Sequence, residues 1–502
     1  MSYLLGIDVG TTSLKCVLFD QKGKALASYG SEYEVSMPQP EFMEVDVEDY
    51  WKAFKKSLKA VLNESKVNPN EISGVGVSSQ GETFVVLDKN GKPLRRAIVW
   101  LDNRSKEEAH LIKDEFGVNK VYEVTGQNDV VPTWPATKIL WLKRNEPEVF
   151  KRAHKYLLLE DYIIYRLTGE YVTDYSVVSS SLLFDISRRK WWSEILNFIG
   201  LSEDQLPELK PSGAQVGNIA LEVAEETGLS KNTIVSTGAY DHAAEAVGVG
   251  NIESGIVTET TGGALAIVAT VDRIILDPLY RFPCHHHAAE GKYFLQPWCP
   301  TAGVILKWYR DNFSLLEIEA ANKIGIDPYE LLTLEASKSP PGSEELILLP
   351  FFAGVASPEP NPNAKGVLFG LTLHHRKSHF IRAIMESIAY LLRSNIEVLE
   401  ERGIKVREVR SIGGGARSRL WNQIKADVLQ RPILTVHTEE NAALGVAILA
   451  GLATGVFNSL EYAVKSMVSI KEKFIPSMVN KSLYERLYKT YVELYKRLKE
   501  LF

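Results

Sequence analysis

The chain has 502 residues, too many for one ordinary hydrophobic core, so its length indicates two to four domains. It contains 57 Lys and Arg against 63 Asp and Glu, and this slightly acidic balance disfavours nucleic acid or an anionic membrane as a partner. The three cysteines form no CxxC pair, and no apolar run approaches the roughly 20 residues of a membrane-spanning helix. The N-terminus also lacks a basic leader region, so we expect a cytoplasmic protein.

The first hundred residues alternate strand and helix patterns. Apolar runs at 3–7, 14–19 and 25–29, separated by short polar turns, predict three consecutive strands. Residues 47–65 have apolar side chains at helical spacing, and further strands are predicted at 74–77, 84–87 and 97–100. This alternation predicts an α/β fold.

The second half begins with a pattern like that of the N-terminus. Strands predicted at 255–258 and 264–270 flank a turn of small residues at 260–263. The similarity suggests two related halves, each directing a hairpin turn toward the same place. Glycines near 245–255 interrupt the pattern, and we place the boundary there, which gives domains 1–247 and 248–502.

Two long helices are predicted in the second half. The first covers 378–400, with Ser378 as its N-cap. The second covers 482–502 and is opened by a capping box formed by Ser482 and Glu485. Its apolar stripe could bind a partner, but packing on its own domain is the favoured interpretation.

Residues 6–15, GIDVGTTSLK, combine a turn of small residues with a carboxylate. The backbone N–H groups and hydroxyls of such a turn can bind phosphate oxygens without net positive charge. Asp8 could hold Mg²⁺ directly or through water, and Lys15 could reach the same anion. An ordinary hairpin turn, with an Asx-type bond from Asp8, is an equal alternative.

Two later motifs each allow a functional and a structural interpretation. Asp241, in STGAYDHAAEAVGVG (236–250), could accept a proton from a substrate hydroxyl, although capping of the following helix explains it as well. In 406–433 a strand runs into three glycines, 413–415, and then a helix. The glycines would admit a nucleoside close to the backbone, and a tight strand–helix connection is the alternative.

Consecutive histidines follow Cys284, at positions 285–287. Alternate residues of a strand face opposite ways, so these three side chains cannot converge on one ion. We therefore do not expect a zinc site there.

Together the motifs resemble the FGGY carbohydrate kinases, which belong with the actin, hexokinase and Hsp70-type ATPases. The resemblance covers nearly the whole chain, and the segments are in the family's order. They are GIDVGTTSLKCVLFD (6–20), AIVWLDNRS (97–105), the Pro135-x-x-Lys138-Ile-Leu-Trp141 signature, LLLEDYIIYRLTGEYVTDYS (157–176), GAYDHAAEAVGVG (238–250), NPNAKGVLFGLTLHH (361–375), GGGARSRLWNQIKADVLQRPI (413–433) and TEENAALGVAILAG (438–451).

This resemblance implies two ribonuclease-H-like domains flanking a catalytic cleft, with ATP and Mg²⁺ mainly on the second domain. It assigns Asp241 as the catalytic base and Asp8 as the magnesium-side carboxylate. The ATP-binding residues it implies are Thr11, Thr12, Ser13, Lys15, Gly262, Gly263, Gly414, Gly415 and Ser418. At Gly263 the family usually has a Thr, so one hydroxyl contact to the γ-phosphate is lost or comes from a neighbour.

The substrate residues implied by the resemblance are Gln80, Gly81, Glu82, Thr133, Asp241 and His242. Glycerol kinases, which this segment resembles, have Gln-Arg-Glu-Thr at the positions of residues 80–83 and a Tyr at the position of Thr133. Replacing that Arg by Gly81 and that Tyr by Thr133 predicts a larger pocket, which disfavours a three-carbon substrate. Typical xylulose kinases have a Gln-Met-His-Gly motif at the same place, and this chain lacks that motif too.

Glu82 suits a polyhydroxylated substrate without a carboxylate, so we expect a small ketose or polyol, most of all a pentulose such as xylulose or ribulose. Alternatives are glycerol, erythritol or another polyol, a sugar acid, and a non-kinase ATPase-type binding module. The expected partners are the sugar and ATP, with no nucleic acid and no membrane. A homodimer is one assembly that we consider.

Overall fold

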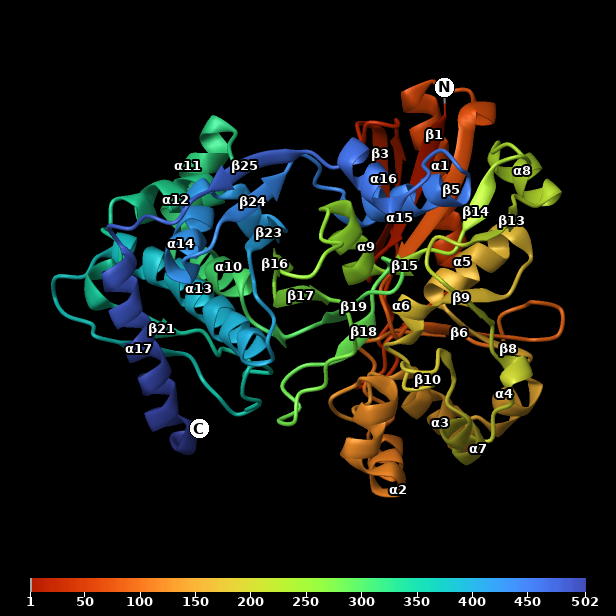
Figure 1. Cartoon of the computed structure of the whole chain (residues 1–502), viewed down its shortest axis with the longest axis horizontal. Helices are drawn as coiled ribbons and strands as arrows, with labels where there is room; N and C mark the ends of the chain where they lie inside the picture. Colours follow the sequence, from red (N-terminus) through yellow and green to blue (C-terminus); the bar gives the residue numbers. More distant parts are fainter. Residues whose placement is uncertain (1) are drawn as a thin grey trace.

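In the computed structural model, which describes residues 2–502, the chain forms two α/β lobes side by side (Figure 1). The first lobe, on the right, is built on a seven-stranded sheet of order β13-β14-β5-β1-β2-β3, with β15 also paired to β5. These strands are β1 (Tyr3–Val9), β2 (Ser13–Phe19), β3 (Ala25–Glu32), β5 (Ile72–Ser79), β13 (Gln215–Asn218), β14 (Ile234–Ser236) and β15 (Ala239–Tyr240).

The second lobe is built on an eight-stranded sheet of order β18-β19-β17-β16-β23-β24-β25, with β20 paired to β17. Its strands are β16 (Ile256–Thr261), β17 (Leu265–Val271), β18 (Cys284–His286), β19 (Tyr293–Leu295), β20 (Trp298–Cys299), β23 (Glu408–Ile412), β24 (Ile433–Val436) and β25 (Ile470–Phe474).

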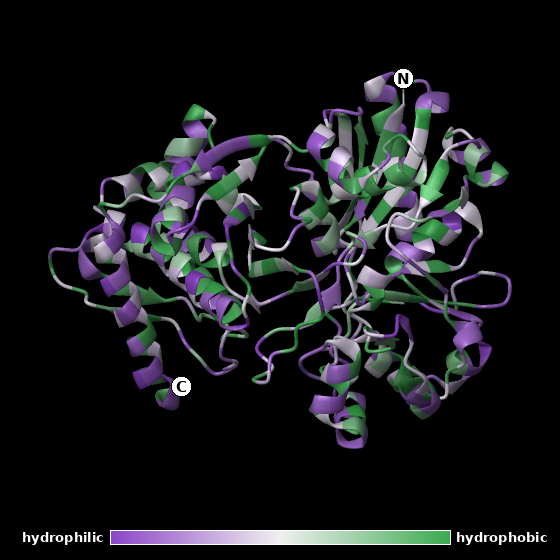
Figure 2. Cartoon of the chain, in the orientation of Figure 1, coloured by the Kyte–Doolittle hydropathy of each residue, from purple (hydrophilic) through white to green (hydrophobic). Residues whose placement is uncertain are grey.

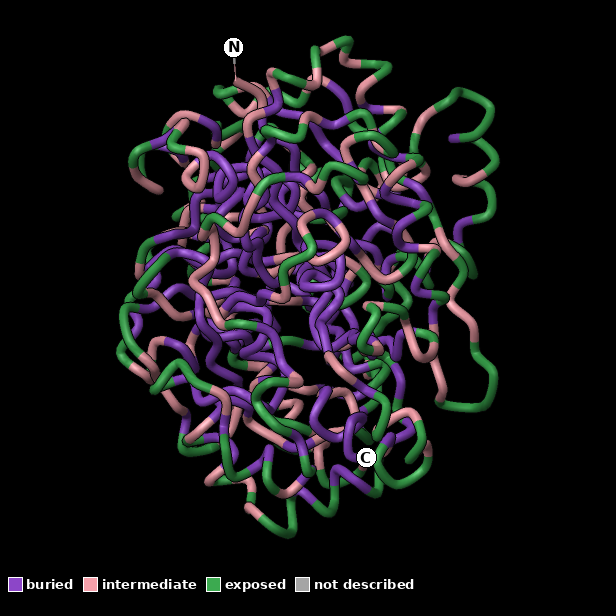
Figure 3. The backbone as a smooth tube through the Cα atoms, turned by 90° about the vertical axis from the view of Figure 1, so that its right-hand side faces the viewer, coloured by how far each residue is buried: buried purple, intermediate pink, exposed green. Residues whose placement is uncertain are grey.

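The two sheets share one topology. In each, an antiparallel hairpin (β1–β2 or β16–β17) is joined on one side by parallel strands: β5 and β14 in the first lobe, β23 and β24 in the second. The predicted hairpin strands, the strands at 74–77 and 84–87 and the helix at 47–65 are thereby confirmed. Apolar residues concentrate in both sheets (Figure 2), and buried residues fill the interior while exposed segments lie at the periphery (Figure 3).

Helices cover both sheets. In the first lobe they include α1 (Val47–Ser65), α2 (Lys106–Thr125), α3 (Pro135–Asn145), α5 (Leu159–Thr168), α8 (Leu221–Thr227), α9 (Asp241–Gly248), α15 (Asn441–Ala453) and α16 (Leu460–Met467). In the second they include α10 (Gly303–Phe313), α11 (Leu315–Ile324), α12 (Pro328–Ser337), α13 (Lys377–Glu401), α14 (Arg419–Leu429) and α17 (Lys481–Leu498). A small sheet contains the four strands β4 (Glu44–Val45), β6 (Phe84–Leu87), β7 (Ala97–Ile98) and β8 (Lys155–Leu158). Another is formed by β21 (Ile347–Leu349) and β22 (Val367–Phe369).

Helix α15 is late in the chain but packs on the first sheet (Figure 1). The backbones are in direct contact there. A Cβ added at Gly6 of β1 would lie 2.0 Å from Ala443 O, and one added at Gly76 of β5 would lie 2.2 Å from Val446 O. The first lobe therefore contains a segment from the predicted domain 248–502. The division at 247/248 stays a prediction.

Glycines also bring α15 against α9, the helix that begins at Asp241. A Cβ at Gly445 of α15 would lie 1.9 Å from Ala244 O, and one at Gly248 of α9 would lie 1.9 Å from Asn441 O. Each helix thus has a glycine where the other's backbone approaches. The position of α9 depends on both contacts.

Three predicted element ends are wrong. Helix α13 begins at Lys377, and the ring Nδ1 of His379 accepts the Arg376 N–H at 2.9 Å, so Ser378 is not its N-cap. Helix α17 begins at Lys481 without a side-chain cap. The predicted strand 97–100 is only two residues long, Ala97–Ile98.

Helix α17 packs on its own lobe, as predicted. Glu485, expected in the capping box, instead accepts a 2.7 Å bond from Arg393 of α13. Leu487 and Tyr491 of its stripe are buried in the core of the second lobe. Over residues 2–502, no helix combines the length and the apolarity needed to cross a bilayer.

The glycine contacts of α15 give the first prediction. Gly76→Ala should lower the free energy of unfolding by about 1–3 kcal/mol, because the clash is with backbone that cannot rotate away. Gly217→Ala, on edge strand β13, is the control, since a Cβ there meets nothing within 4 Å. Thermal and urea unfolding of both variants measure the effect. Equal stability of the two variants would contradict the packing described.

Candidate functional site

Carboxylates from three elements meet at the ends of β1 and β15. Asp8 of β1 interacts electrostatically with Asp241 and Glu245 of α9, and with Glu440 before α15. Burial and these negative neighbours raise the pKa of Asp8 to about 7, and only Lys15 acts in the opposite direction. Such a cluster favours a bound cation.

Asp241 is the first residue of α9, and one of its oxygens accepts the His242 N–H at 2.7 Å. This bond is not a helix cap: the N-cap of α9 is Tyr240, no side chain caps the helix, and the capping interpretation of Asp241 is wrong. Burial raises the pKa of Asp241, and Glu245 adds to the shift while His242 opposes it. A carboxylate with a raised pKa is a better proton acceptor, so the local bond is compatible with a role as a base.

His242 and Glu245 connect this cluster to the second lobe. His242 Nδ1 donates to Glu245 Oε2 at 3.1 Å, and Thr260 Oγ1, at the end of β16, donates to the same oxygen at 3.4 Å. Burial alone would lower the pKa of His242, but the two carboxylates beside it raise that pKa to about 9. The turns of both hairpins therefore lie near Glu245.

Residues in and just after the first hairpin turn, at 11–13, have partners on two sides. Thr11 Oγ1 accepts the Trp100 indole N–H at 3.0 Å, while Thr12 is exposed. Lys15 donates to Glu440 Oε2 at 2.6 Å, which ties β2 to the residues before α15. Lys15 is thus already paired, and reaching an anion would require it to share or leave Glu440.

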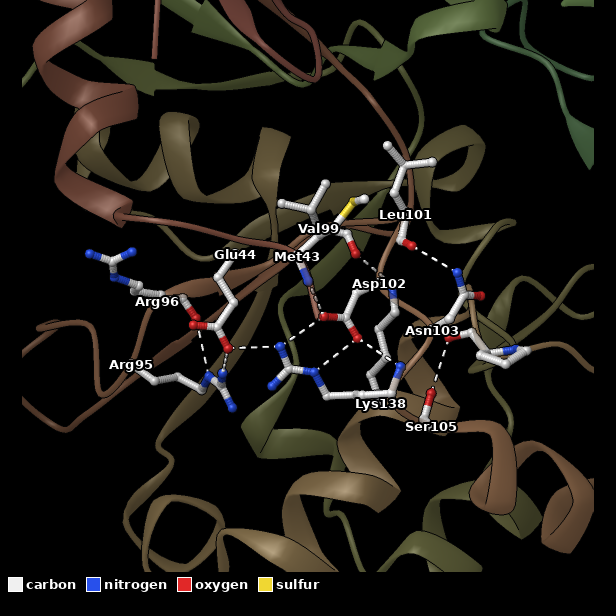
Figure 4. A network of polar contacts seen from close by, with 12 residues as sticks. Met43, Glu44, Arg95, Arg96, Val99, Leu101, Asp102, Asn103, Ser105 and Lys138 are labelled. Atoms are coloured by element: carbon white, nitrogen blue, oxygen red, sulfur yellow. Dashed lines mark hydrogen bonds and ion pairs between the residues drawn. The ribbon is translucent and has the colours of Figure 1, made fainter. Parts of the chain in front are cut away.

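A buried network surrounds the segment that contains Trp100, and Figure 4 shows its members Val99, Asp102 and Lys138. Lys138 Nζ donates to the carbonyl oxygens of Val99 at 2.9 Å and Trp100 at 3.2 Å, and burial lowers the pKa of this lysine to about 7. Next to it, Asp102 pairs with Arg104 at 2.7 Å. The signature lysine therefore acts on the first turn through Trp100.

In the turn of the second hairpin, between β16 and β17, helix α10 fixes the position of Gly262. The Gly303 N–H at the start of α10 donates to Gly262 O at 2.8 Å. Gly263 is exposed, and a Cβ there would meet nothing within 4 Å. The chain could therefore accommodate the usual Thr at this position, and its loss is not forced by packing.

The three glycines at 413–415 differ in their surroundings. Gly413 has a φ of 76°, and a Cβ on Gly415 would lie 2.7 Å from the Thr261 side chain, so both are explained by the tight strand–helix connection. Gly414 is exposed with open space beside it. Ser418 caps α14 by accepting the Trp421 N–H at 3.3 Å.

A buried ion pair supports the turn at 262–263 and the glycines at 413–415, and no local sequence pattern predicts it. Lys425 of α14 donates to Glu259 of β16 at 2.5 Å and to Thr261 Oγ1 at 3.0 Å. Ser411 of β23 also donates to Glu259. Because Lys425 and Glu259 are fully buried, this pair fixes the ends of β16 and β23 relative to α14.

Gln80 and Glu82 follow β5 and lie beside Asp241. Both polar atoms of the Gln80 amide are buried without a partner among the residues described. Glu82 has a φ of 61°, and burial together with Asp241 raises its pKa to about 7. Unpaired buried amides are costly, so a ligand or water is expected at Gln80.

The larger pocket predicted at Gly81 is wrong. A Cβ on Gly81 would lie 2.7 Å from the Tyr240 ring and 2.8 Å from Ser180 Oγ, so these side chains occupy the space of the missing one. Thr133 lies in the turn before α3. Its role stays a prediction.

His285 is a site residue that sequence reasoning missed. Its ring is parallel to that of Tyr240, with centroids 5.8 Å apart, and to that of Phe294 at 5.0 Å. Both ring nitrogens are buried without a partner within residues 2–502, and burial lowers its pKa to about 3, so the imidazole is neutral. The run of three histidines was a visible signal, but it was judged only as a metal site.

The carboxylate pKa values give the second prediction. The folded protein keeps protons on Asp8 and Glu82 up to about pH 7, whereas in the unfolded chain both carboxyls ionise near pH 4. Their contribution to stability is thus fully present below about pH 4 and is lost as pH rises through 7. Asp8→Asn should raise the melting temperature more at pH 8 than at pH 5.

Thermal unfolding without nucleotide, from pH 5 to pH 8, measures this effect. Asp114→Asn, at an exposed position of α2, is the control and should change the melting temperature equally at both pH values. A gain from Asp8→Asn that is the same at pH 5 and pH 8 would contradict the carboxylate cluster.

Comparison with known proteins agrees with this arrangement. The FGGY family of carbohydrate kinases matches through its N-terminal domain at residues 3–248 and its C-terminal domain at 263–454. The chain is 32% identical over 494 residues to a gluconokinase from Bacillus licheniformis, covering 98% of this chain and 95% of the relative. It is also 32% identical over 505 residues to a xylulose kinase from Lactococcus lactis, covering 100% and 98%.

Among solved structures, the ligand-bound xylulose kinase from Lactobacillus acidophilus superposes with a TM-score of 0.90 at 27% identity, covering 99% of both chains. Matches of this extent cover both lobes and all the turns described above. The chain belongs to the FGGY family of carbohydrate kinases.

Proposed function

We propose that this carbohydrate kinase transfers the γ-phosphate of ATP to a hydroxyl of a small ketose, most of all a pentulose such as xylulose or ribulose. The observation that carries the proposal is the position of Asp241. Its carboxylate is close enough to interact electrostatically both with Asp8, at the end of β1, and with Glu82, two residues after the unpaired Gln80 amide. A base in that place can act on a sugar hydroxyl that faces a phosphate.

In the proposed reaction, Asp241 takes the proton of the sugar hydroxyl. The hydroxyl oxygen forms a bond to the γ-phosphorus while the bond to the β,γ-bridging oxygen breaks, and ADP leaves. The exposed turns at 11–13 and 262–263 would bind the phosphate oxygens through N–H groups and hydroxyls. Open space at Gly414 is available for the nucleoside.

Mg²⁺ fits the donors present. It prefers oxygen ligands, and it usually keeps several waters and binds through one or two carboxylates plus substrate phosphates. Asp8 has this character, and residues 2–502 contain no group of three or more His, Cys, Asp or Glu that could hold a metal by themselves. We propose that Asp8 holds the ion, which would neutralise charge on the phosphates.

A neutral sugar suits the site better than a sugar acid. Glu82, Asp241 and Glu245 are all acidic. Of the cations near them, His242 is bonded to Glu245, and Lys138 is bonded to the carbonyl oxygens of Val99 and Trp100. A substrate carboxylate would be repelled there unless it displaced one of these bonds. Gluconate remains the main alternative because one close relative is named a gluconokinase; glycerol, erythritol and other polyols are further alternatives.

Asp241→Asn should lower sugar-dependent ADP release by about 100- to 10,000-fold, because the amide cannot accept the proton. It should leave ATP binding, measured by calorimetry, nearly unchanged. Asp114→Asn provides a matched control that should keep full turnover. Unchanged turnover in Asp241→Asn would exclude this residue as the base.

The substrate is tested by a coupled ADP assay over xylulose, ribulose, gluconate, erythritol and glycerol. A pentulose should have the highest kcat/KM, and gluconate a value at least tenfold lower because of the acidic side chains. A kcat/KM for gluconate or glycerol far above that of every pentulose would overturn the choice of substrate, while leaving the kinase assignment intact.

A further inference from the structure

A pair of buried carboxyls lies against the segment that leads to Asp241. Glu160 belongs to α5, Asp174 is the last residue of β9 (Val172–Asp174), and both are fully buried. Within residues 2–502, no hydrogen bond or ion pair joins either of them to a Lys, Arg or His. Burying carboxyls without a cation costs stability, and the reaction described above does not use this pair.

The two carboxyls share one proton. Their side chains are hydrogen-bonded to each other, which requires that one of them is protonated, since a carboxylate has no donor. Burial, followed by the charges of Asp174 and Asp161, raises the pKa of Glu160 well above its usual value. Burial also raises the pKa of Asp174, but hydrogen bonds from Ser176 and Ser212 oppose that rise. The proton therefore resides on Glu160.

The pair holds the backbone before α9. Glu160 Oε1 accepts the Gly238 N–H at 2.9 Å. Asp174 Oδ1 accepts the Ser176 hydroxyl at 2.6 Å, and Ser176 Oγ in turn accepts the Tyr240 N–H at 3.0 Å. The first and third N–H groups of this segment, residues 238–240, are thus bound to the pair, one directly and one through a serine.

The same segment lies against β5. Strand β15 has only two residues, and among the residues described it pairs with β5 alone. A Cβ on Gly238 would lie 1.5 Å from Val77 O, so the two backbones are in contact. Asp241 comes next and begins α9, a helix without a side-chain cap. The position of its carboxylate therefore depends on how residues 238–240 are held.

We infer that Glu160 is a positioning residue for Asp241, an inference that rests on the proposed role of Asp241 as the base. The neutral Glu160 carboxyl donates a hydrogen bond to Asp174 and accepts the Gly238 N–H. The pair thereby fixes the backbone that directs Asp241 toward the sugar hydroxyl. An ionised Glu160 would repel Asp174 and could not donate to it, so this arrangement requires the neutral acid.

Two substitutions at Glu160 test this role in the coupled ADP assay. Glu160→Gln keeps one donor and one acceptor, as in the neutral acid, and should keep kcat within about twofold. Glu160→Leu has neither, and it should lower kcat about 10- to 100-fold, because a small displacement of a catalytic group has an effect of that size. The KM for ATP should change less than about twofold, since Glu160 does not bind substrate.

Two neighbouring residues provide a control and a second variant. Asp161 is equally buried but accepts the Leu158 N–H at 2.8 Å, so Asp161→Asn should keep full kcat. Ser176→Ala removes only the acceptor of the Tyr240 N–H and should lower kcat about tenfold, even if Glu160→Leu does not fold. Melting temperatures identify the variants that are folded.

A double variant tests whether Glu160 acts through Asp241. Added to Asp241→Asn, Glu160→Leu should lower the residual turnover less than about twofold, because no base is left to position. An undiminished further fall would overturn the inference, as would a Glu160→Gln variant with the low kcat expected for Glu160→Leu. Full kcat in Glu160→Leu and Ser176→Ala, with turnover lost in Asp241→Asn, would overturn this inference alone. Full turnover in Asp241→Asn would overturn the proposed base as well.

Infrared spectroscopy tests the shared proton without any turnover. The difference between the wild type and Glu160→Gln at pH 8 should contain the carbonyl band of a neutral carboxylic acid. Absence of that band would show an ionised Glu160 and would overturn the inference.

Discussion

The first lobe depends on a contact between backbones. Helix α15 lies directly on β1 and β5 because Gly6 and Gly76 have no side chains to hold it away, and it meets α9 through Gly248 and Gly445. One helix therefore sets the relative positions of a strand and a helix that carry acidic residues. Backbone contacts tolerate little adjustment, since protein interiors are close-packed and a single added methyl must displace main chain. The geometry of the carboxylate cluster follows from this packing.

The carboxylate cluster lowers the stability of the folded protein and favours the binding of ligands. Asp8, Asp241, Glu245 and Glu82 are gathered with fewer cations than carboxylates. Burial and the neighbouring negative charges raise the pKa values of Asp8, Asp241 and Glu82. A folded protein gains nothing from such an arrangement alone. In the proposed reaction, a metal ion would supply positive charge and a sugar would supply the hydrogen-bond donors that the cluster lacks. We expect the site to be most strained when it is empty at neutral pH.

Local patterns predicted the elements well and the contacts between distant segments poorly. The helix at 47–65, both hairpins and the two-lobed fold follow from periodicity, turns and ordered motifs. The cap at Ser378 was wrong because the helix begins earlier and the His379 ring accepts the Arg376 N–H. The capping box at Ser482 was wrong because Glu485 instead binds Arg393, a tertiary partner. The prediction of a larger pocket at Gly81 was wrong for a related reason. The ring of Tyr240, about 160 residues later in the chain, occupies the space beside Gly81. The Lys425–Glu259 pair and the rings around His285 likewise join segments whose proximity no single stretch of sequence reveals. The roles of the site residues remain predictions.

The place of α15 in the chain affects how the protein is made. Strands β1 and β5 leave the ribosome first, yet the helix that covers them is encoded more than 360 residues after β5. Until residue 453 has been synthesised, one apolar face of the first sheet has no cover. Domains usually fold as units during synthesis, beginning with the N-terminal one. Here the N-terminal sheet must wait for nearly the entire second lobe, so the nascent chain should need protection by chaperones, and a fragment ending at residue 247 should aggregate.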